Sequence, residues 1–293
     1  MDRKKGVFLI LLSTLMFASY GTFSRLMGEF FPNFYQAWTR GLFIAVILLP
    51  ILLWKKQIII IERKDWGWIA VYIISTCLTQ APIYYAFNHM DIGSATLLFF
   101  VSMLLTMYFF GFIFLGEKAT KVKLACLLLA GIGMYFIFSF TLAAFTLLAA
   151  LMAAFNGMAS GTEVSSSKKL TGNYSTTYLN WISWICIAIT HLAISLYIGE
   201  TQLVPSLDIA WLYYAGYLVA SILGFWLIIE GLKYLEASVG GLIGLLEIVF
   251  SITFGFLVFH EGITLRVAIG GVLIMIAASL PHAVELISKK RAV

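Results

Sequence analysis

Apolar segments long enough to cross a bilayer follow one another along nearly the whole chain. A transmembrane helix needs about 20 mainly apolar residues, and short polar connections separate about ten such segments. They lie approximately at 7–26, 34–53, 66–87, 93–115, 122–140, 142–165, 176–198, 209–229, 238–259 and 264–287. The pattern predicts an all-α membrane protein with ten transmembrane helices and leaves no stretch for a soluble domain.

The composition agrees with a protein whose main solvent is lipid. Of the 293 residues, 61% are hydrophobic and only 11% are charged, whereas roughly a quarter of the residues in soluble domains are charged. No small-residue cleavage site follows the first apolar segment, so we expect a retained helix rather than a signal peptide. Cys77, Cys126 and Cys186 lie within predicted spans without metal-ligand spacing, and we expect them to pack as small apolar side chains. No metal and no other cofactor is expected.

The basic residues predict the orientation of the chain in the membrane. A net charge of +5 could indicate a nucleic-acid partner, so the test is where the basic residues lie relative to the spans. With ten crossings, 16 of the 19 Lys and Arg residues fall on the side of the N-terminus, and only Arg25, Arg40 and Arg266 fall on the other. Cytoplasmic loops are enriched in Lys and Arg. We therefore expect a protein of the inner (plasma) membrane with both termini in the cytoplasm, and no nucleic-acid partner.

One internal repeat is visible, at an offset of about half the chain. Segment 110–120 aligns without gaps with segment 254–264, and Phe, Gly, Phe, Glu and Thr match at an offset of 144 residues. Five predicted helices separate the copies, and because five is odd, the second copy enters the membrane from the opposite side. The sequence therefore predicts two inverted five-helix repeats, 1–141 and 142–293. In transporters built this way the substrate site lies near mid-membrane between the repeats.

Several short motifs stand in or beside the predicted helices. Leu115-Gly116-Glu117 follows the fourth helix, and His260-Glu261 takes the matching place in the second half; Leu246-Glu247-Ile248 lies in the ninth helix and Trp38-Thr39-Arg40-Gly41 near the start of the second. These motifs resemble those of the EamA-like family of the drug/metabolite transporter (DMT) superfamily. The family has a leucine-glycine-glutamate turn that the second half usually repeats with glycine, a glutamate-proline motif, here with isoleucine in place of proline, and an arginine-bearing start of the second helix.

The resemblance implies a fold and a class of function. Such proteins are ten-helix transporters in which helices one to four and six to nine surround a central cavity, and helices five and ten are peripheral. They move small polar metabolites, often amino acids and commonly outward, without ATP. The resemblance thus implies a secondary active exporter of amino acids or amines that works by alternating access, and not an enzyme.

Glu247 is the first candidate for substrate binding. A charge at the centre of a bilayer costs at least ~2.5–3.5 kcal/mol, so an ionisable residue within a span is a functional hypothesis. Glu247 shares one helix face with Gly240, Gly244 and Ser251, at spacings of four, three and four residues. This face should look into the protein. Glu247 could bind a substrate ammonium group or a coupling proton, or it could form a structural hydrogen bond to another helix.

Glu163 and Arg40 are two further charged residues within predicted spans. Glu163 lies on a stripe with Asn156 and Ser160 that should face the cavity, and pairing with Lys168 near the cytoplasmic end is an equal alternative. Arg40 lies about two turns into the second helix. Its planar guanidinium could bind a substrate carboxylate, or it could pair with a carboxylate or a backbone carbonyl at the outer rim.

Aromatic and polar side chains on other predicted cavity helices complete the candidate site. Tyr20 lies in the first helix, Gln80 and Tyr84 in the third and Tyr217 in the eighth, each beside polar neighbours. Aromatic walls could hold an apolar side chain or, through cation-π attraction, an ammonium group. Core packing or lipid contact is an equal alternative for each. Glycines in helices five and ten indicate close packing, and these helices could also form a homodimer.

Three functional classes predict different features of the sequence. A secondary transporter predicts inverted repeats and polar groups in mid-membrane. An intramembrane enzyme needs paired acids, a metal cluster or a nucleophile with a base, and the sequence contains none of these, nor a nucleotide-binding P-loop. A passive channel would lack saturable, gradient-coupled flux. Within the transporter class, a carrier of hydrophobic drugs or cations is the alternative to a carrier of small polar metabolites.

Overall fold

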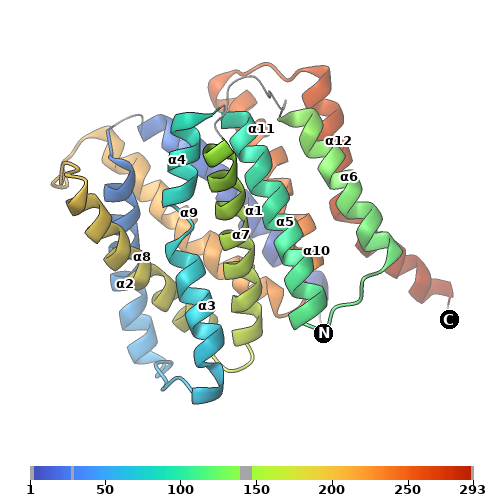
Figure 1. The fold of residues 1–293 in the computed structure, drawn as a ribbon, viewed down its shortest axis with the longest axis horizontal. Coiled ribbons are helices and arrows are strands. Elements are labelled where there is room, and N and C mark those ends of the chain that lie inside the picture. Colours follow the sequence, from blue (N-terminus) through green and yellow to red (C-terminus); the bar gives the residue numbers. More distant parts are fainter. Residues whose placement is uncertain (1–2, 28–29, 91, 139–146, 292–293) are drawn as a thin grey trace.

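The described part of the chain is a bundle of helices. The computed structural model describes residues 3–27, 30–90, 92–138 and 147–291, and these residues form no strand. The helices are α1 (Arg3–Met27), α2 (Asn33–Trp54), α3 (Trp66–Cys77), α4 (Ala81–His89), α5 (Ile92–Phe114), α6 (Lys121–Ile137), α7 (Leu147–Leu170), α8 (Thr176–Tyr197), α9 (Ile209–Leu232), α10 (Ala237–Gly244), α11 (Leu246–Phe259) and α12 (Leu265–Arg291) (Figure 1). The predicted boundary between the halves, at residue 141, lies outside the described residues.

Eight helical stretches of the described chain are long and apolar enough to cross a membrane. Two of these stretches are divided: Arg63–Phe87 contains a short 3₁₀ helix, Arg63–Asp65, followed by α3 and α4, and Ala237–Phe259 contains α10 and α11. Helix α6 has 17 residues, and the apolar part of α12, Leu265–Pro281, is also shorter than the eight. The all-helical class predicted from the sequence is therefore confirmed, whereas the number of ten crossings stays a prediction.

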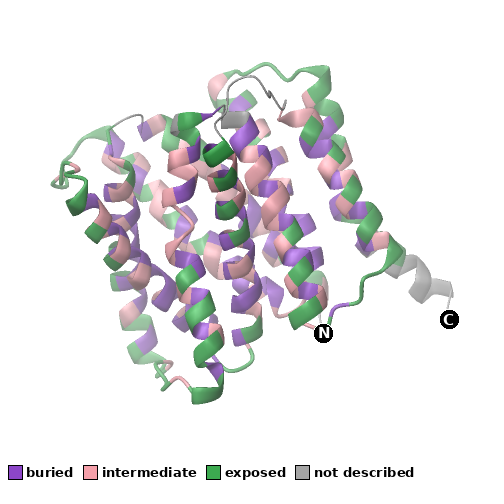
Figure 2. Cartoon of the chain, viewed as in Figure 1, coloured by how far each residue is buried: buried purple, intermediate pink, exposed green. Residues whose placement is uncertain are grey.

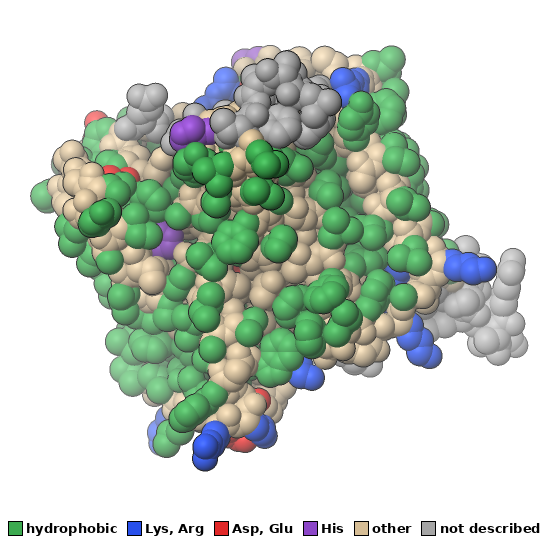
Figure 3. Space-filling model, in the orientation of Figure 1, with side chains coloured by type: hydrophobic (Ala, Val, Ile, Leu, Met, Phe, Trp, Pro, Cys, Tyr) green, Lys and Arg blue, Asp and Glu red, His purple; other side chains and the backbone are tan. Residues whose placement is uncertain are grey.

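The outer surface of the bundle is apolar. Ile113, Leu128 and Leu151 are 59%, 70% and 55% exposed, and buried positions concentrate where helices face one another (Figure 2). Hydrophobic side chains cover the middle of the face seen in Figure 3, and Lys and Arg gather mainly towards its lower edge. Since extended apolar surface marks contact with a partner or a membrane, these side chains face lipid.

Helix contacts in one half recur in the other. Helix α1 packs against α9 and α11, and its counterpart α7 packs against α3, α4 and α5. Helix α2 pairs with its counterpart α8, and α6 pairs with α12 at one edge of the bundle (Figure 1). The two turns that carry the sequence repeat, after α5 and after α11, lie at opposite ends of the bundle (Figure 1). This is the arrangement expected of inverted repeats.

The two ends of the bundle differ in charge. We call the end where α5 stops and α6 and α10 begin, which carries Lys118, Lys121 and Lys168, the lysine-rich face. The end where α11 stops, near Arg25 and Glu261, is the opposite face. The predicted orientation corresponds to a cytoplasmic lysine-rich face.

Two predicted spans are interrupted. The sequence predicted the first as a continuous helix, and Ile248 in place of the family's proline left a break in the second open. The predicted helix 66–87 is divided into α3 and α4 by residues 78–80. Pro82 explains this break, because proline has no backbone N–H and its ring clashes with the carbonyl four residues earlier. The predicted helix 238–259 is divided at Leu245, two residues before Glu247. The second break forms without the proline of the family motif.

Glycines allow the peripheral helices to pack closely. A Cβ atom on Gly133 of α6 would lie 2.9 Å from the carbonyl oxygen of Gly270 of α12, and a Cβ atom on Gly270 would lie 2.6 Å from the carbonyl oxygen of Gly133. Only a residue without a side chain fits at either position. The predicted packing role is therefore confirmed for Gly133 and Gly270 but not for Gly131 and Gly271, which have open space beside them within the described chain.

Candidate functional site

Arg40 lies inside the bundle among aromatic rings. It is 3% exposed, and its guanidinium carbon Cζ lies 4.7 Å from the ring centre of Tyr217, 5.3 Å from that of Trp184 and 5.8 Å from that of Tyr20. These are cation-π distances. The rings of Tyr20 and Tyr217 meet edge to face, with their centres 4.6 Å apart. We call Tyr20, Trp184 and Tyr217 the aromatic box; they bring α1, α8 and α9 around one charge on α2.

The sequence neighbours of Arg40 hold it in this place. A Cβ atom on Gly41 would lie 2.6 Å from the backbone oxygen of Trp184, so glycine lets α2 approach α8 closely. The hydroxyl group of Thr39 shares a hydrogen bond with that of Tyr214 on α9. The segment Trp38–Gly41, which carries part of the family resemblance, thus has a packing reason, since it positions α2 against α8 and α9.

No acidic group of the described chain pairs with Arg40. Its Nε and Nη1 atoms are buried without a hydrogen bond partner. The sequence left open that Arg40 pairs with a carboxylate or a carbonyl at the outer rim. This pair is not found among the described residues. A buried guanidinium with unused donors can bind a carboxylate, because its planar fork matches the two carboxylate oxygens.

Glu247 lines a cavity of about 370 Å³ between α1, α4, α5, α6 and α11. Tyr20, Thr96 and Ser251 are its other polar side chains, and the rest of the lining is mainly apolar and aromatic. Within the described chain Glu247 forms neither a hydrogen bond nor an ion pair. The alternative role of Glu247, a structural hydrogen bond to another helix, is therefore not found among the described residues. Because Tyr20 lines this cavity and also contacts Arg40, one side chain connects the two charged groups.

Gln80 and Tyr84 lie towards Arg40 rather than towards lipid. The hydroxyl group of Tyr84 donates a hydrogen bond of 2.9 Å to Gln80 Oε1. The ring of Tyr84 meets that of Phe34 edge to face at 5.5 Å, and Tyr84 is close enough to Arg40 to interact with its charge. Tyr84 thus lies near Arg40 and Tyr217, and Gln80 is held beside Tyr84 by their hydrogen bond.

Glu163 belongs to a different polar cluster. It is 4% exposed, and its Oε1 atom accepts hydrogen bonds from the hydroxyl groups of Thr76 at 2.9 Å and Ser183 at 3.2 Å. The alternative pairing with Lys168 is not formed, because Lys168 lies 3.2 Å from Glu117 instead. Glu163 is buried, but it neither lines the Glu247 cavity nor joins Arg40.

The predicted residues therefore divide into two groups. Those near Arg40 or the Glu247 cavity are Tyr20, Arg40, Gln80, Tyr84, Tyr217 and Glu247. Glu163 lies apart, and Asn156 is buried two turns from it with no partner for its Oδ1 atom among the described residues.

Two residues of helix α8 contact the predicted residues but were not predicted themselves. Trp184 faces Arg40 and Ser183 faces Glu163. A signal was present, because Thr176, Asn180 and Ser183 are spaced by four and three residues and mark one polar helix face. All three are buried.

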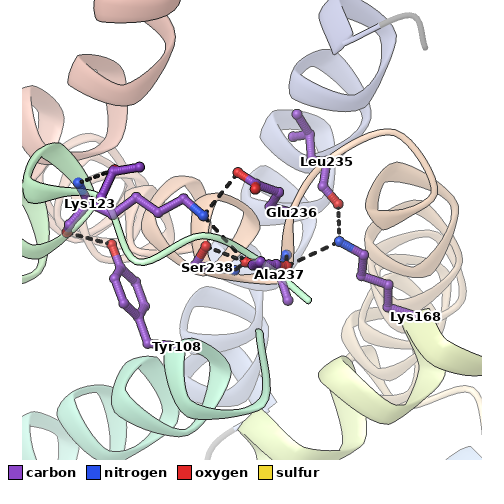
Figure 4. A network of polar contacts seen from close by, with 9 residues as sticks. Tyr108, Lys123, Lys168, Leu235, Glu236, Ala237 and Ser238 are labelled. Atoms are coloured by element: carbon purple, nitrogen blue, oxygen red, sulfur yellow. Dashed lines mark hydrogen bonds and ion pairs between the residues drawn. The ribbon is translucent and has the colours of Figure 1, made fainter. Parts of the chain in front are cut away.

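A polar network joins the two halves at the lysine-rich face (Figure 4). Glu117, in the turn after α5, accepts hydrogen bonds from the backbone N–H groups of Ala237 and Ser238 at the start of α10. Lys168 of α7 and Lys123 of α6 lie 3.2 and 3.7 Å from the Glu117 carboxylate. The N-terminal end of a helix favours negative charge, so Glu117 links the first half to the second.

The carboxylate of Glu117 is stabilised in its charged form. Burial favours the neutral acid, but the hydrogen bond from the Ser238 hydroxyl, the charge of Lys168 and the backbone N–H groups of Ser238 and Ala237 outweigh it and hold the pKa of Glu117 below its usual value. Glu261, its counterpart at the opposite face, pairs with Arg25. The Glu261 side chain is 53% exposed, whereas that of Glu117 is 3% exposed.

Comparisons with known proteins agree with this architecture. A solved structure titled "Crystal structure of protein" is similar, with a TM-score of 0.81 over 97% of this chain and 98% of its own, and at 16% identity it shows the fold alone. No curated protein matches the sequence. The sequence profile of the EamA-like transporter family matches residues 4–139 and again residues 144–280. The chain therefore belongs to the EamA-like transporter family, within the drug/metabolite transporter superfamily.

Proposed function

We propose that this protein is a secondary active transporter that exports small zwitterionic metabolites, such as neutral amino acids, across the inner membrane by alternating access. The observation that carries the proposal is Arg40, a buried cation without an acidic partner in the described chain. A charge inside a membrane is costly and is usually paired. A substrate carboxylate would supply the missing partner.

Glu247 supports a second charged contact with the same substrate. It lines a cavity without a partner of its own, and Tyr20 lies both in that cavity and against Arg40. An amino acid carries an ammonium group for Glu247 and a carboxylate for Arg40. The cavity of about 370 Å³ falls within the range of small-molecule sites, which is roughly 300–1,000 Å³. Its apolar lining suits an uncharged side chain.

The two inverted turns support alternating access. At the lysine-rich face Glu117 holds the start of α10, whereas at the opposite face Glu261 is half exposed and pairs with Arg25. In an inverted-repeat transporter that is closed at one face and open at the other, the two copies of a turn are expected to have different surroundings. A buried Glu117 and an exposed Glu261 fit this expectation. Basic residues favour a cytoplasmic lysine-rich face and cytoplasmic termini.

Three ligands that share one side chain test the site. L-Leucine carries both charged groups, isoamylamine lacks the carboxylate, and 4-methylpentanoate lacks the ammonium group. We expect Arg40→Gln to lower the affinity for leucine and 4-methylpentanoate on the order of 100-fold, because a buried charge pair is lost. Glu247→Gln should do the same for leucine and isoamylamine. The measurements are ligand-induced shifts in melting temperature and uptake of labelled leucine into proteoliposomes.

Two control variants each remove a charge outside the proposed site and so test whether loss of any charge lowers transport. Arg266→Gln removes an arginine at the opposite face that bonds to the backbone oxygen of Tyr135, and Glu62→Gln removes a carboxylate whose side chain is 60% exposed. Both should leave leucine uptake unchanged. A folded Arg40→Gln variant with normal uptake would refute the site. Binding of dyes and amines without leucine would identify the drug or cation carrier, and flux that does not saturate would identify a channel.

A further inference from the structure

A second buried carboxylate lies apart from the proposed substrate site. Glu163 accepts hydrogen bonds only at Oε1, from Thr76 of α3 and Ser183 of α8, and its Oε2 atom accepts none from the described chain. Both donors are neutral hydroxyl groups. The nearby basic residue of the same helix, Lys168, is engaged by Glu117 and by the carbonyl oxygen of Leu235. Glu163 therefore has donors for its charged form but no positive charge beside it.

The cluster lies where helix α3 is interrupted. Thr76 is in the last turn of α3, which ends at Cys77, although the chain from Arg63 to Phe87 forms a single span. The interruption therefore leaves a helix C-terminus inside the span. Such an end carries partial negative charge, and a carboxylate placed beside it favours a bound cation. In transporters with discontinuous helices, these ends coordinate Na⁺ or H⁺.

The surroundings of Glu163 contain few titratable groups. Tyr72 and Cys77 of α3 are near enough to interact with its charge, and Cys186 of α8 lies next to them. Helices α4, α5, α9 and α10 also pack on α7. In the described chain they place no charged side chain against Glu163.

We propose that Glu163 is the binding site of the coupling proton and that this site is separate from the substrate site. The inference rests on the proposed function, because a coupling ion requires a transporter. A proton fits better than a metal cation. The side chains of Glu163, Thr76 and Ser183 bring only four oxygen atoms together among the described residues, whereas Ca²⁺ and Mg²⁺ take about six or more ligands.

The hydroxyl groups of the cluster can serve both protonation states. Serine and threonine hydroxyls donate and accept hydrogen bonds. In the structure both lie within hydrogen-bond distance of Oε1 of Glu163, and two hydroxyl donors at this atom stabilise the charged carboxylate. When Oε2 takes up a proton the carboxyl group becomes neutral, and the hydroxyls of Thr76 and Ser183, which are 3.5 Å apart, can turn towards one another. Release of the proton restores the observed arrangement.

Proteoliposomes containing Glu163→Gln separate coupling from substrate passage, with Glu62→Gln as the matched control. Counterflow, in which labelled L-leucine outside exchanges with unlabelled L-leucine inside, measures substrate passage without a pH gradient. Accumulation of leucine under an imposed pH gradient measures coupling. We expect Glu163→Gln to keep wild-type counterflow and to lose pH-driven accumulation by about 5–150-fold, the usual range of coupling between sites. Unchanged pH-driven accumulation in this variant, or accumulation in the wild type driven by a Na⁺ gradient instead, would overturn the proposal.

An infrared measurement tests proton binding without transport. Spectra of the purified protein at different pH values should contain a carboxyl C=O band that disappears in Glu163→Gln and persists in Glu247→Gln. The absence of a band assignable to Glu163 would overturn the proposal even if leucine were not a substrate. Failure of leucine binding and counterflow in the wild type would instead count against the proposed function.

A second variant covers the case in which Glu163→Gln does not fold. Thr76→Val combined with Ser183→Ala keeps the acid but removes both donors to its charged form. Each lost bond to a charged group favours the protonated state, so the pH at which half of Glu163 is protonated should rise by about one unit or more. If the carboxyl band of Glu163 reaches half of its intensity at the same pH as in the wild type, the proposed site is contradicted.

Discussion

The turn after α5 and the turn after α11 have the same backbone arrangement but different surroundings. In the first, the backbone N–H of Glu117 donates to the carbonyl of Gly111 at 2.9 Å, and in the second, Glu261 donates to Gly255 at 3.2 Å. The Glu117 side chain is 3% exposed and lies against the start of α10, whereas that of Glu261 is 53% exposed. Local sequence thus determines the turn, and distant helices decide what its carboxylate binds.

This difference should appear as a difference in stability. Removing one member of a buried, hydrogen-bonded charge pair costs about 3–5 kcal/mol, because the remaining groups lose their partner. An exposed ion pair contributes about 0–1 kcal/mol. The two glutamates therefore offer a matched pair of positions within one protein.

The largest effect is expected from removing Glu117. Glu117→Ala should lower the free energy of unfolding by about 3–5 kcal/mol, because Lys168 and the first N–H groups of α10 lose their acceptor. Glu261→Ala should change it by about 0–1 kcal/mol. Unfolding of the purified proteins in detergent, followed by circular dichroism, measures both values. Equal losses in the two variants would show that burial does not distinguish the turns.

Acid should weaken the lysine-rich face in particular. The pKa of Glu117 is lower in the folded protein than its usual value of 4.5, so its contribution to stability is present above that value and is lost as the pH falls through the folded-state pKa. We expect the wild type to lose stability below about pH 4.5 and Glu117→Gln to lose less over the same range. Melting temperatures measured between neutral and acidic pH test this. Parallel curves for the two proteins would argue against Glu117 as the responsible group.

The smallest expected effects concern the residue before each glutamate. Gly116 and His260 both adopt left-handed backbone conformations, with φ values of 68° and 54°. Glycine tolerates this region, whereas other residues lose about 1–2 kcal/mol in it. His260→Gly should therefore stabilise the protein by about 1 kcal/mol, and Gly116→Ala should destabilise it by a similar amount. Chemical denaturation measures both changes, and changes of the same sign would contradict the shared geometry.

The fold class was predictable because its signals are local. Runs of apolar residues identify helices in lipid wherever they pack, and the repeat at 110–120 and 254–264 indicated inverted halves without any contact information. Individual inward-facing residues were also predictable, because polar positions at helical spacing mark one face. Glu247 and Glu163 were found in this way. The interruption of helix three was missed, since a change in hydrogen bonding over a few residues leaves the hydropathy pattern intact. The interruption of helix nine was left open, because isoleucine stands in place of the family's proline.

Which buried charges meet was decided only by the tertiary structure. Arg40 could have paired with an acid at the rim, and it lies instead between Tyr20, Trp184 and Tyr217 of three other helices. Lys168 could have paired with Glu163, five residues earlier, and it binds Glu117 of the other half instead. Hydropathy, charge and spacing belong to single segments and are contained in the sequence. The partner of a charge depends on how segments far apart in the chain pack, because only packing brings them within hydrogen-bond distance.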